Sequence, residues 1–298
     1  MGRGFLVGHV NGDQRRHLGA AETPPPVSTT QRRWIHMCGR YASARSRIEL
    51  LEEFSVQRDR VDESLKPDYN VAPTKPVYAV MTRKPRPDTA KSDKSDGEAA
   101  SRRELRVVRW GLVPSWARDV SIGSRMINAR AETVSEKPAF RKAFASRRCL
   151  LPADGYYEWQ PPATGTKGPK QPYFICRPDQ GVLAFAGIYE LWRDRSIAAD
   201  DPAAWLWTAA VITTTAPDEL GEIHDRMPMV IDPASWADWL DAANTDAADV
   251  RALLAPAASS GLISYPVSVA VNSVRNNGPE LVREAEPVSP GSGGRSDA

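Results

Sequence analysis

Residues 148–160, Arg-Cys-Leu-Leu-Pro-Ala-Asp-Gly-Tyr-Tyr-Glu-Trp-Gln, decide the fold of this chain. Two short runs of apolar and aromatic residues, Arg148–Leu151 and Tyr156–Gln160, are typical of β-strands. The Asp-Gly pair between them predicts a tight turn. Successive side chains of a strand face opposite sides, so Tyr157 and Trp159 share one face while Tyr156 and Glu158 share the other. The second strand therefore carries one carboxylate among aromatic rings.

Similar runs on both sides of this stretch predict a protein built mostly from strands. Helical patterns are fewer and shorter. Many strands with few helices between them argue for an α+β fold, a mainly antiparallel, β-rich single domain with flanking helices. The further strands that we expect are Val77–Thr82, Leu105–Trp110, Tyr173–Arg177, Val182–Tyr189, Trp205–Thr214 and Ile263–Val269.

Four short helices are expected from apolar spacing and capping residues. The first is capped by Ser43, and the second follows the Thr133–Glu136 capping-box pattern. The third opens at Asp232-Pro233, and the fourth covers Ala247–Leu254. The residues that the first three would turn toward the core are Ile48, Leu51, Phe54, Phe140, Phe144, Trp236, Trp239 and Leu240.

Three segments do not fit the pattern of a folded domain. Residues 1–36 lack periodicity and contain three consecutive prolines, so we expect a disordered extension or a start codon assigned too far upstream. Residues 84–103 are polar and repeat Lys-Ser-Asp, which predicts a surface insertion between two paired strands. Residues 287–298 are expected to be a flexible tail, which leaves 38–286 as the catalytic domain.

Composition excludes several classes of protein. A hydrophobic content of 41% and a charged content of 26% are those of a soluble globular protein. The three cysteines are far apart and form no CxxC pair, so we expect no disulfide framework, no metal site and a cytoplasmic location. No apolar run approaches the ~18–20 residues of a membrane span. With a net charge of +2, nucleic-acid binding would need a local basic surface. Nothing indicates a cofactor or more than a monomer.

Cys38 is the most reactive candidate, because it follows Met37 directly. If translation starts at Met37 and the methionine is removed, Cys38 carries a free α-amine beside its thiol. Such a 1,2-aminothiol condenses with an aldehyde: the amine forms a Schiff base and the thiolate closes a thiazolidine ring. The amine titrates near ~7.7–8.0 and the thiol near ~8.5, so both are partly available at neutral pH.

Glu158 and His224 are candidate proton carriers. A carboxyl among aromatic rings is desolvated, which raises its pKa and suits it to proton transfer. A strand-edge glutamate in a salt bridge is the plainer alternative. His224 is the only histidine after residue 36, and its side chain is the one with an ordinary pKa near neutrality. A lone histidine is more often a packing or surface residue.

Several segments combine amide, cationic and aromatic side chains in a way that suits nucleic acid. Asn70 precedes the turn at Pro73, and residues 127–132 bring together Asn128, Arg130 and a carboxylate. Residues 110–116, which begin at Trp110, offer an aromatic shelf for a base. Capping, core packing and a solvated surface explain the same residue types. The arginines near these segments are Arg40, Arg109, Arg118, Arg125, Arg130, Arg141, Arg147, Arg148, Arg226 and Arg275.

Seven motifs in order resemble the SRAP (SOS response-associated peptidase) family, whose members shield abasic sites in single-stranded DNA. The resemblance covers roughly Cys38 to Val282. The motifs are Met-Cys-Gly-Arg-Tyr at 37–41, Tyr-Asn-Val-Ala-Pro at 69–73, Trp-Gly-Leu-Val-Pro at 110–114, Ile-Asn-Ala-Arg-Ala-Glu at 127–132, Asp-Gly-Tyr-Tyr-Glu-Trp at 154–159, His-Asp-Arg-Met-Pro at 224–228 and Val-Asn-Ser-Val-Arg-Asn-Asn-Gly at 271–278.

The resemblance implies a role for each matching residue. Cys38 would crosslink to the ring-opened abasic sugar, Asn70 would position that sugar, and Glu158 would shuttle protons. His224 would assist ring opening and reversal. The resemblance also implies self-cleavage by a cysteine-type autopeptidase, a lyase-like activity, and a β-rich domain with a basic groove for single-stranded DNA. The residues expected to contact DNA are Arg40, Pro73, Trp110, Asn128, Arg130 and Arg226.

The chain departs from the family pattern because 36 residues precede Met37. A misassigned start, self-cleavage before Cys38 and an inactive full-length form each explain the departure, and we expect the first. Two rival functions stay open. A cysteine peptidase that acts on other proteins would use a dyad of Cys38 and His224, with no need for an α-amine. A non-catalytic DNA-binding module would form no crosslink at all.

Overall fold

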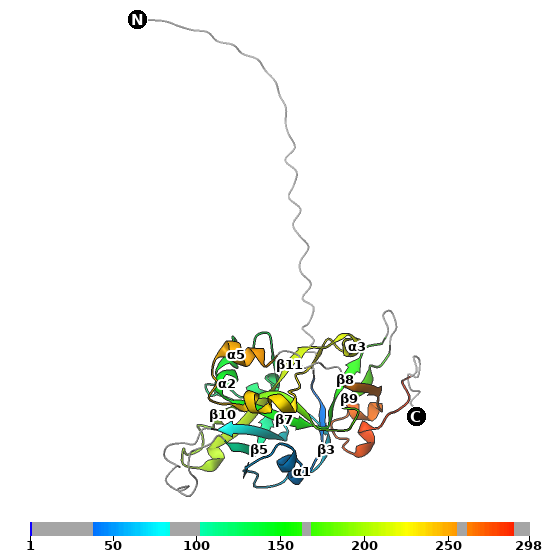
Figure 1. Ribbon diagram of the computed structural model, residues 1–298, viewed down its shortest axis with the longest axis horizontal. Coiled ribbons are helices and arrows are strands. Elements are labelled where there is room, and N and C mark those ends of the chain that lie inside the picture. The colour runs from blue at the N-terminus through cyan, green and yellow to red at the C-terminus, as the bar shows by residue number, and fades with distance from the viewer. Residues whose placement is uncertain (2–37, 84–101, 163–167, 255–260, 289–298) are drawn as a thin grey trace. The chain divides into compact units, whose positions relative to one another are not determined.

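Two β-sheets organise the computed structural model, which describes Met1 and residues 38–83, 102–162, 168–254 and 261–288 (Figure 1). The described residues from Cys38 onward form one compact unit. The smaller sheet has five strands, in the order β13 (Ile263–Pro266), β9 (Gln171–Cys176), β8 (Gly155–Gln160), β1 (Tyr41–Ser43) and β3 (Asp68–Val71).

The larger sheet closes into a barrel. Its strand order is β12 (Arg226–Pro228), β11 (Trp205–Thr215), β10 (Leu183–Arg193), β7 (Arg148–Ala153), β4 (Pro76–Arg83), β5 (Arg102–Trp110) and β2 (Arg58–Asp59). A parallel pairing of β5 with β11, which sets Arg109 opposite Thr208, joins the ends of the run from β11 to β5. The short strand β6 (Asn128–Arg130) also pairs with β11.

Successive side chains of a barrel strand face opposite sides, so each strand contributes to two hydrophobic clusters. On β4, Val77, Ala79 and Met81 pack with aromatic residues of the smaller sheet. The intervening Tyr78 and Val80 belong to a second cluster that the helices contribute to. A strand that is apolar on both faces is covered on both sides, here by the smaller sheet and by helices.

The helices are short, and all except α3, whose Leu220 packs in the first cluster, contribute residues to the second cluster. They are α1 (Arg47–Glu53), α2 (Arg141–Ser146), α3 (Asp218–Gly221), α4 (Trp236–Leu240) and α5 (Ala247–Ala252), and α2 and α5 lie side by side (Figure 1). The 3-10 turns are η1 (Val120–Arg125), η2 (Pro202–Ala204), η3 (Pro233–Ser235), η4 (Val269–Asn272) and η5 (Pro279–Val282). The predicted β-rich α+β fold is confirmed.

The predicted turn between the two decisive strands is a bend at Asp154, and it does more than reverse the chain. β7, before the bend, belongs to the barrel, whereas β8, after it, belongs to the smaller sheet. The predicted division of faces on β8 is confirmed: Tyr156 packs in the cluster between the sheets, and Tyr157 packs in a third cluster on the other face. The stretch 148–160 thus connects the two sheets.

Several predicted boundaries were wrong. The first helix is capped by Ser46 in a capping box with Glu49, so Ile48 points to solvent and Leu50 is buried instead. Thr133 caps nothing: residues 131–140 form turns, its hydroxyl has no hydrogen-bond partner, and α2 begins only at Arg141. The last strand ends at Pro266, because a 3-10 turn follows at Val269.

The predicted pairing around the polar insertion is confirmed, since β4 and β5 are antiparallel neighbours. However, β5 begins at Arg102, so Arg102 and Arg103 belong to the strand and not to the insertion. The rest of the insertion, the extension over 1–36 and most of the tail lie outside the described residues. The sequence patterns missed the short strands β1, β2, β3, β6 and β12. Within the described residues, no helix is long and apolar enough to span a membrane.

Gly155 tests the connection between the sheets. A β-carbon built at this position would lie 2.4 Å from Cζ of Phe174 and 2.7 Å from the carbonyl oxygen of Ile175. We therefore expect Gly155→Ala to lower the free energy of unfolding by about 1–3 kcal/mol, as overpacked cores do. Urea denaturation measures the change.

The matched control is Gly168→Ala. The β-carbon there would approach no atom more closely than 4.0 Å. Equal stability of the two variants would contradict the close packing at the start of β8.

Candidate active site

Cys38 is buried where three strands meet, and each strand holds it by one hydrogen bond. Its backbone nitrogen donates to Oε1 of Glu158 on β8 at 2.8 Å. Its thiol donates to the carbonyl oxygen of Arg226 on β12, with 3.6 Å between sulfur and oxygen. Nδ2 of Asn128 on β6 donates to the carbonyl oxygen of Cys38 at 3.4 Å. The cysteine is therefore fixed through its backbone and its side chain.

The register between β1 and β8 brings Cys38 to Glu158. Tyr41 pairs with Tyr156 and Ala42 with Gly155, and the Tyr157 amide donates to the Arg40 carbonyl at 3.0 Å. Continuing this antiparallel register places the residues before β1 beside Glu158. A slip of one residue would turn Glu158 to the opposite face of the sheet.

Cys38 has a φ of +45°, in the left-handed region that residues with a β-carbon rarely adopt. Such a conformation costs on the order of 1 kcal/mol or more and persists only where the surroundings enforce it. The three hydrogen bonds to β8, β12 and β6 supply that constraint.

Burial makes the thiol and the carboxyl unusual acids. Desolvation raises the pKa of Glu158 to about 7, although hydrogen bonds from Cys38 oppose the rise. Desolvation, and then the nearby Glu158 carboxylate, raise the pKa of the Cys38 thiol well above its ordinary value, while Arg226 lowers it. Near neutral pH the thiol therefore keeps its proton, and Glu158 can take up or release one.

His224 lies close to this pair, but no described hydrogen bond joins it to Cys38 or to Glu158. Its Nδ1 accepts a hydrogen bond from the Arg226 amide at 3.0 Å. Nδ1 also lies 3.1 Å from the carboxylate of Asp225. The predicted dyad of Cys38 and His224 is thus not formed in this structure.

Asn70 is fully buried and holds protein segments together. Its side-chain nitrogen donates to the carbonyl oxygens of Val271, Ser273 and Asn276 at 2.9–3.2 Å. Its side-chain oxygen accepts from Arg40 at 2.6 Å. All its hydrogen-bonding groups are used within the protein in this structure, and its role in positioning a sugar stays a prediction.

Arg40 and Arg226, which were expected to hold phosphates, are both used within the protein. Arg40 donates to Asn70 and to the carbonyl oxygens of Val271 and Asn272. Arg226 forms a two-pronged ion pair with Glu132, with nitrogen–oxygen distances of 2.5 and 3.1 Å. It also donates to the Thr213 carbonyl at 2.6 Å. The Arg226 guanidinium is thus buried and paired within the protein, and phosphate binding by Arg226 stays a prediction.

Trp110 is buried in this structure, and its contact with DNA stays a prediction. Trp110 is 1% exposed, and its indole nitrogen donates to the Ile127 carbonyl at 3.0 Å. At the other end of the same motif, Trp116 is 58% exposed, so it is the ring that this segment presents to solvent. Arg130 on β6 is exposed, and Pro73 is half-buried. Arg130 is the predicted phosphate ligand that is left accessible.

Sequence reasoning missed two acids at the site. Glu132 was noticed only as a neighbour of Arg130, but it anchors Arg226, and that hydrogen bond lowers the pKa of its carboxyl. Asp225 raises the pKa of both Cys38 and Glu158. The sequence held one indication of Asp225, because this residue directly follows His224 in the motif at 224–228. Among the described residues, no three His, Cys, Asp or Glu side chains come together as a metal site.

The arrangement offers a thiol, a nitrogen on the adjacent carbon and a carboxyl that titrates near neutrality. In the 298-residue chain that nitrogen is an amide, because Met37 precedes it. Without Met37 the same nitrogen is an α-amine, 2.8 Å from the Glu158 carboxyl. The site can then supply two nucleophiles and one proton carrier to a carbonyl compound.

Comparison of the sequence with known proteins assigns the chain to a family. Residues 37–274 match the sequence profile described as SOS response associated peptidase (SRAP). The chain is 37% identical over 246 residues to the abasic site processing protein YoqW of Bacillus subtilis, covering 83% of this chain and 99% of that protein. It is 31% identical over 240 residues to the abasic site processing protein HMCES of Gallus gallus, covering 73% and 66%.

Solved structures agree in fold. A protein from Bacteroides thetaiotaomicron matches with a TM-score of 0.64 and 25% identity, covering 84% of this chain and 100% of that one. A protein from Bordetella bronchiseptica matches with a TM-score of 0.59 and 23% identity, covering 78% and 100%.

The raised pKa of Glu158 predicts a pH-dependent stability. Between its ordinary value of 4.5 and about 7, the folded chain keeps a proton that the unfolded chain has lost. The contribution of this group is therefore most favourable below pH 4.5 and declines as the pH rises to 7. From pH 5 to pH 7.5, the chain should lose more stability than the variant Glu158→Gln does, by on the order of 3 kcal/mol at most.

Urea unfolding at the two pH values measures this difference. Glu53→Gln, at an exposed glutamate on α1, is the matched control and should behave like the parent chain. Equal pH dependence in the parent and in Glu158→Gln would show that the Glu158 carboxyl titrates at its ordinary value.

Proposed function

The chain belongs to the SOS response associated peptidase (SRAP) family, and on this premise we propose that it processes abasic sites in DNA by joining them covalently to Cys38. The relatives named abasic site processing proteins support the DNA lesion as the substrate. The observation that carries the chemistry is the 2.8 Å contact between the Cys38 nitrogen and the Glu158 carboxyl.

The reaction needs a free α-amine on Cys38, so the bond between Met37 and Cys38 must be absent. Start of translation at Met37 followed by methionine removal would provide it, and so would cleavage before Cys38. The open-chain form of an abasic sugar carries an aldehyde. The α-amine attacks the aldehyde carbon, and the resulting carbinolamine loses water to give a Schiff base.

Ring closure then uses the thiol. The sulfur attacks the imine carbon, the thiol proton passes to the imine nitrogen, and a five-membered thiazolidine forms. Overall, one aldehyde and one aminothiol give one thiazolidine and one water. Glu158, with a pKa of about 7, suits both steps: it can take a proton from the ammonium or thiol and return one to the departing hydroxyl.

Single-stranded DNA is the form of substrate that fits this site. Cys38 is buried at the junction of β8, β12 and β6, so the sugar has to enter between strands of the protein. A flexible single strand can bend its backbone inward without breaking base pairs, whereas a duplex would first have to extrude the nucleotide. Two exposed side chains suit such a strand. Arg130, on the same strand as Asn128, would contact a phosphate, and Trp116 would stack against a base.

The geometry favours this function over the two rivals. A cysteine peptidase would pair the thiol with His224, but the partners of Cys38 are Glu158 and the Arg226 carbonyl. A passive DNA-binding module gives no reason for a buried thiol and a buried carboxyl at one position, because burying both destabilises the folded chain.

Covalent capture tests the proposal directly. A chain that begins at Met37 and a chain that begins at Met1 are each incubated with single-stranded DNA that carries one abasic site. We expect the first to give a band of covalent adduct on a denaturing gel, with intact mass showing Cys38 at the N-terminus and the loss of one water. The chain from Met1 should react only to the extent that residues before Cys38 are removed.

Cys38→Ser should bind the same DNA without a stable adduct, since a hydroxyl replaces the thiol. Cys176→Ser makes the same chemical change at a buried cysteine on β9 and should crosslink normally. Adduct formation by Cys38→Ser at the parent level would overturn the mechanism. Absence of any adduct with both chains would remove crosslinking as the function.

Substitutions of Arg130 and Arg226 distinguish an arginine that contacts DNA from one that stabilises the fold. Arg130→Gln should weaken binding of undamaged single-stranded DNA and reduce the slope of log affinity against log salt by about 0.7, the value for one lost phosphate contact. Fluorescence anisotropy across a salt series measures the slope. Arg177→Gln, at an exposed arginine paired with Asp179, is the matched control.

Arg226→Gln should instead lower thermal stability, because it leaves Glu132 and Thr213 without their partner. A salt slope that is unchanged in Arg130→Gln would contradict a phosphate contact at β6.

A further inference from the structure

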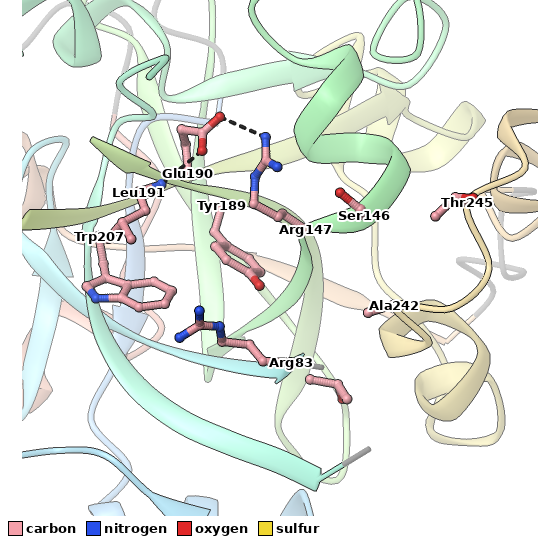
Figure 2. A pocket seen from close by; sticks show the side chains of 10 residues that line it. Arg83, Ser146, Arg147, Tyr189, Glu190, Leu191, Trp207, Ala242 and Thr245 are labelled. Atoms are coloured by element: carbon pink, nitrogen blue, oxygen red, sulfur yellow. Dashed lines mark hydrogen bonds and ion pairs between the residues drawn. The ribbon is translucent and has the colours of Figure 1, made fainter. Parts of the chain in front are cut away.

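A second pocket lies on the barrel, away from Cys38. Its volume is about 430 Å³, and it is lined by strands β4, β10 and β11, the end of α2 and the segment after α4. Figure 2 shows Tyr189 at its centre, with Arg147 on one side and Trp207 and Arg83 on the other. The lining residues that matter here are Arg83, Ser146, Arg147, Tyr189, Glu190 and Trp207.

Two guanidinium groups act on the centre of this pocket. Burial raises the pKa of Tyr189 to about 12, and the positive charges of Arg83 and Arg147 oppose that rise. Both cations therefore lie close enough to the phenol to influence its proton. The Tyr189 hydroxyl points away from the Arg147 guanidinium, which turns toward Glu190 (Figure 2).

The carboxylates nearby are already occupied. Glu190 accepts from Arg147 at 2.8 Å with one oxygen and from the Leu191 amide at 3.0 Å with the other. Glu104, on the neighbouring strand β5, accepts from Arg106 at 2.9 Å. Counting Arg83, Arg106 and Arg147 against these two acids leaves an excess of positive charge at the pocket. An anionic group is the ligand that such a surface attracts.

Aromatic rings form the wall beside the cations. The rings of Tyr189 and Trp207 lie 5.7 Å apart, and the guanidinium carbons of Arg83 and Arg106 lie 5.0 and 4.4 Å from the centroid of the Trp207 ring. Stacked guanidinium and indole planes present a flat surface with positive charge, which suits a planar ring that carries a phosphate.

We propose that this pocket binds a nucleoside 5′-phosphate, with the phosphate held by the Arg83 guanidinium and the Tyr189 hydroxyl and the base against the Trp207 wall. Arginine binds phosphate through paired N–H donors, and tyrosine and serine hydroxyls add neutral donors. A volume of about 430 Å³ lies within the range of small-molecule sites. The phosphate monoester belongs either to a free mononucleotide or to the 5′ end of a DNA strand.

The pocket is separate from the Cys38 site. Trp207 lies near the start of β11, and Thr215, which pairs with Arg226 beside Cys38, lies at its end. Eight residues of strand span about 25 Å. The inference therefore does not rest on crosslinking at Cys38, and either can fail without the other.

Isothermal titration of the full chain with 2′-deoxyadenosine 5′-monophosphate, and in parallel with 2′-deoxyadenosine, tests the proposal. We expect the nucleotide to bind and the nucleoside to bind at least about ten-fold more weakly, because the phosphate supplies the charged contacts. Arg83→Gln should weaken nucleotide binding about ten-fold. Arg125→Gln, at an exposed arginine on η1, is the matched control and should leave it unchanged.

Competition distinguishes the two sources of the phosphate. An oligonucleotide without an abasic site is added with either a 5′-phosphate or a 5′-hydroxyl. Displacement of the mononucleotide by the phosphorylated strand alone identifies a strand end as a ligand, and failure of both strands to displace it identifies a free nucleotide. Equal binding of nucleotide and nucleoside, no binding of either, or full affinity in Arg83→Gln would overturn the proposal.

The same variants are also assayed for crosslinking to abasic DNA. Arg83→Gln should crosslink at the parent rate, because Arg83 touches no residue of the Cys38 site. Loss of crosslinking in Cys38→Ser with nucleotide binding retained would show that the two sites act independently.

Discussion

The hydrogen bonds of Asp154 hold the structure together at the point where the chain leaves the barrel for the smaller sheet. Its carboxylate accepts from the Ala44 amide at 2.6 Å and from Arg45 at 3.2 Å, and its own amide donates to the Ala42 carbonyl at 2.8 Å. These bonds fasten β1 beside β8 in one register. Because Cys38 lies just before β1 and Glu158 lies within β8, the register at this bend sets the distance between the Cys38 nitrogen and the Glu158 carboxyl.

Burial then determines the chemistry of that pair. Desolvation favours the neutral form of both the thiol and the carboxyl, and the Glu158 carboxylate further raises the pKa of the thiol, whereas hydrogen bonds from Cys38 lower the pKa of Glu158. Burial of this pair lowers stability near neutral pH. Arg226 contributes through its backbone: the carbonyl accepts a hydrogen bond from the Cys38 thiol, and the amide donates to Nδ1 of His224. Glu132 and Thr213 hold that backbone in place through the guanidinium.

The arginines show why composition overstates contact with nucleic acid. Arg40 and Arg226 occur in motifs with amides and aromatic residues, yet both donate to protein carbonyls. Arg148 is buried and donates to the carbonyl oxygens of Trp239, Phe144 and Ala145, so it ties α4 to the end of α2. A guanidinium has five donors and satisfies buried carbonyls as readily as phosphates. The sequence identifies an arginine as a hydrogen-bond donor, but only the folded structure shows whether a protein carbonyl is its acceptor.

The sequence by itself determined the fold class, most of the long strands and the two faces of β8, and it singled out Cys38 and Glu158 as candidate reactive groups. These follow from local periodicity and from side-chain chemistry, which are present in the chain before it folds. The short strands β1, β3 and β12 have too few residues to show a period, and their pairing comes from distant partners. The tertiary structure alone decided that Trp110 is buried, that Asn70 supports the C-terminal segment and that Glu132 engages Arg226. Each of these depends on a contact between residues far apart in the chain, and local sequence carries no record of such distances.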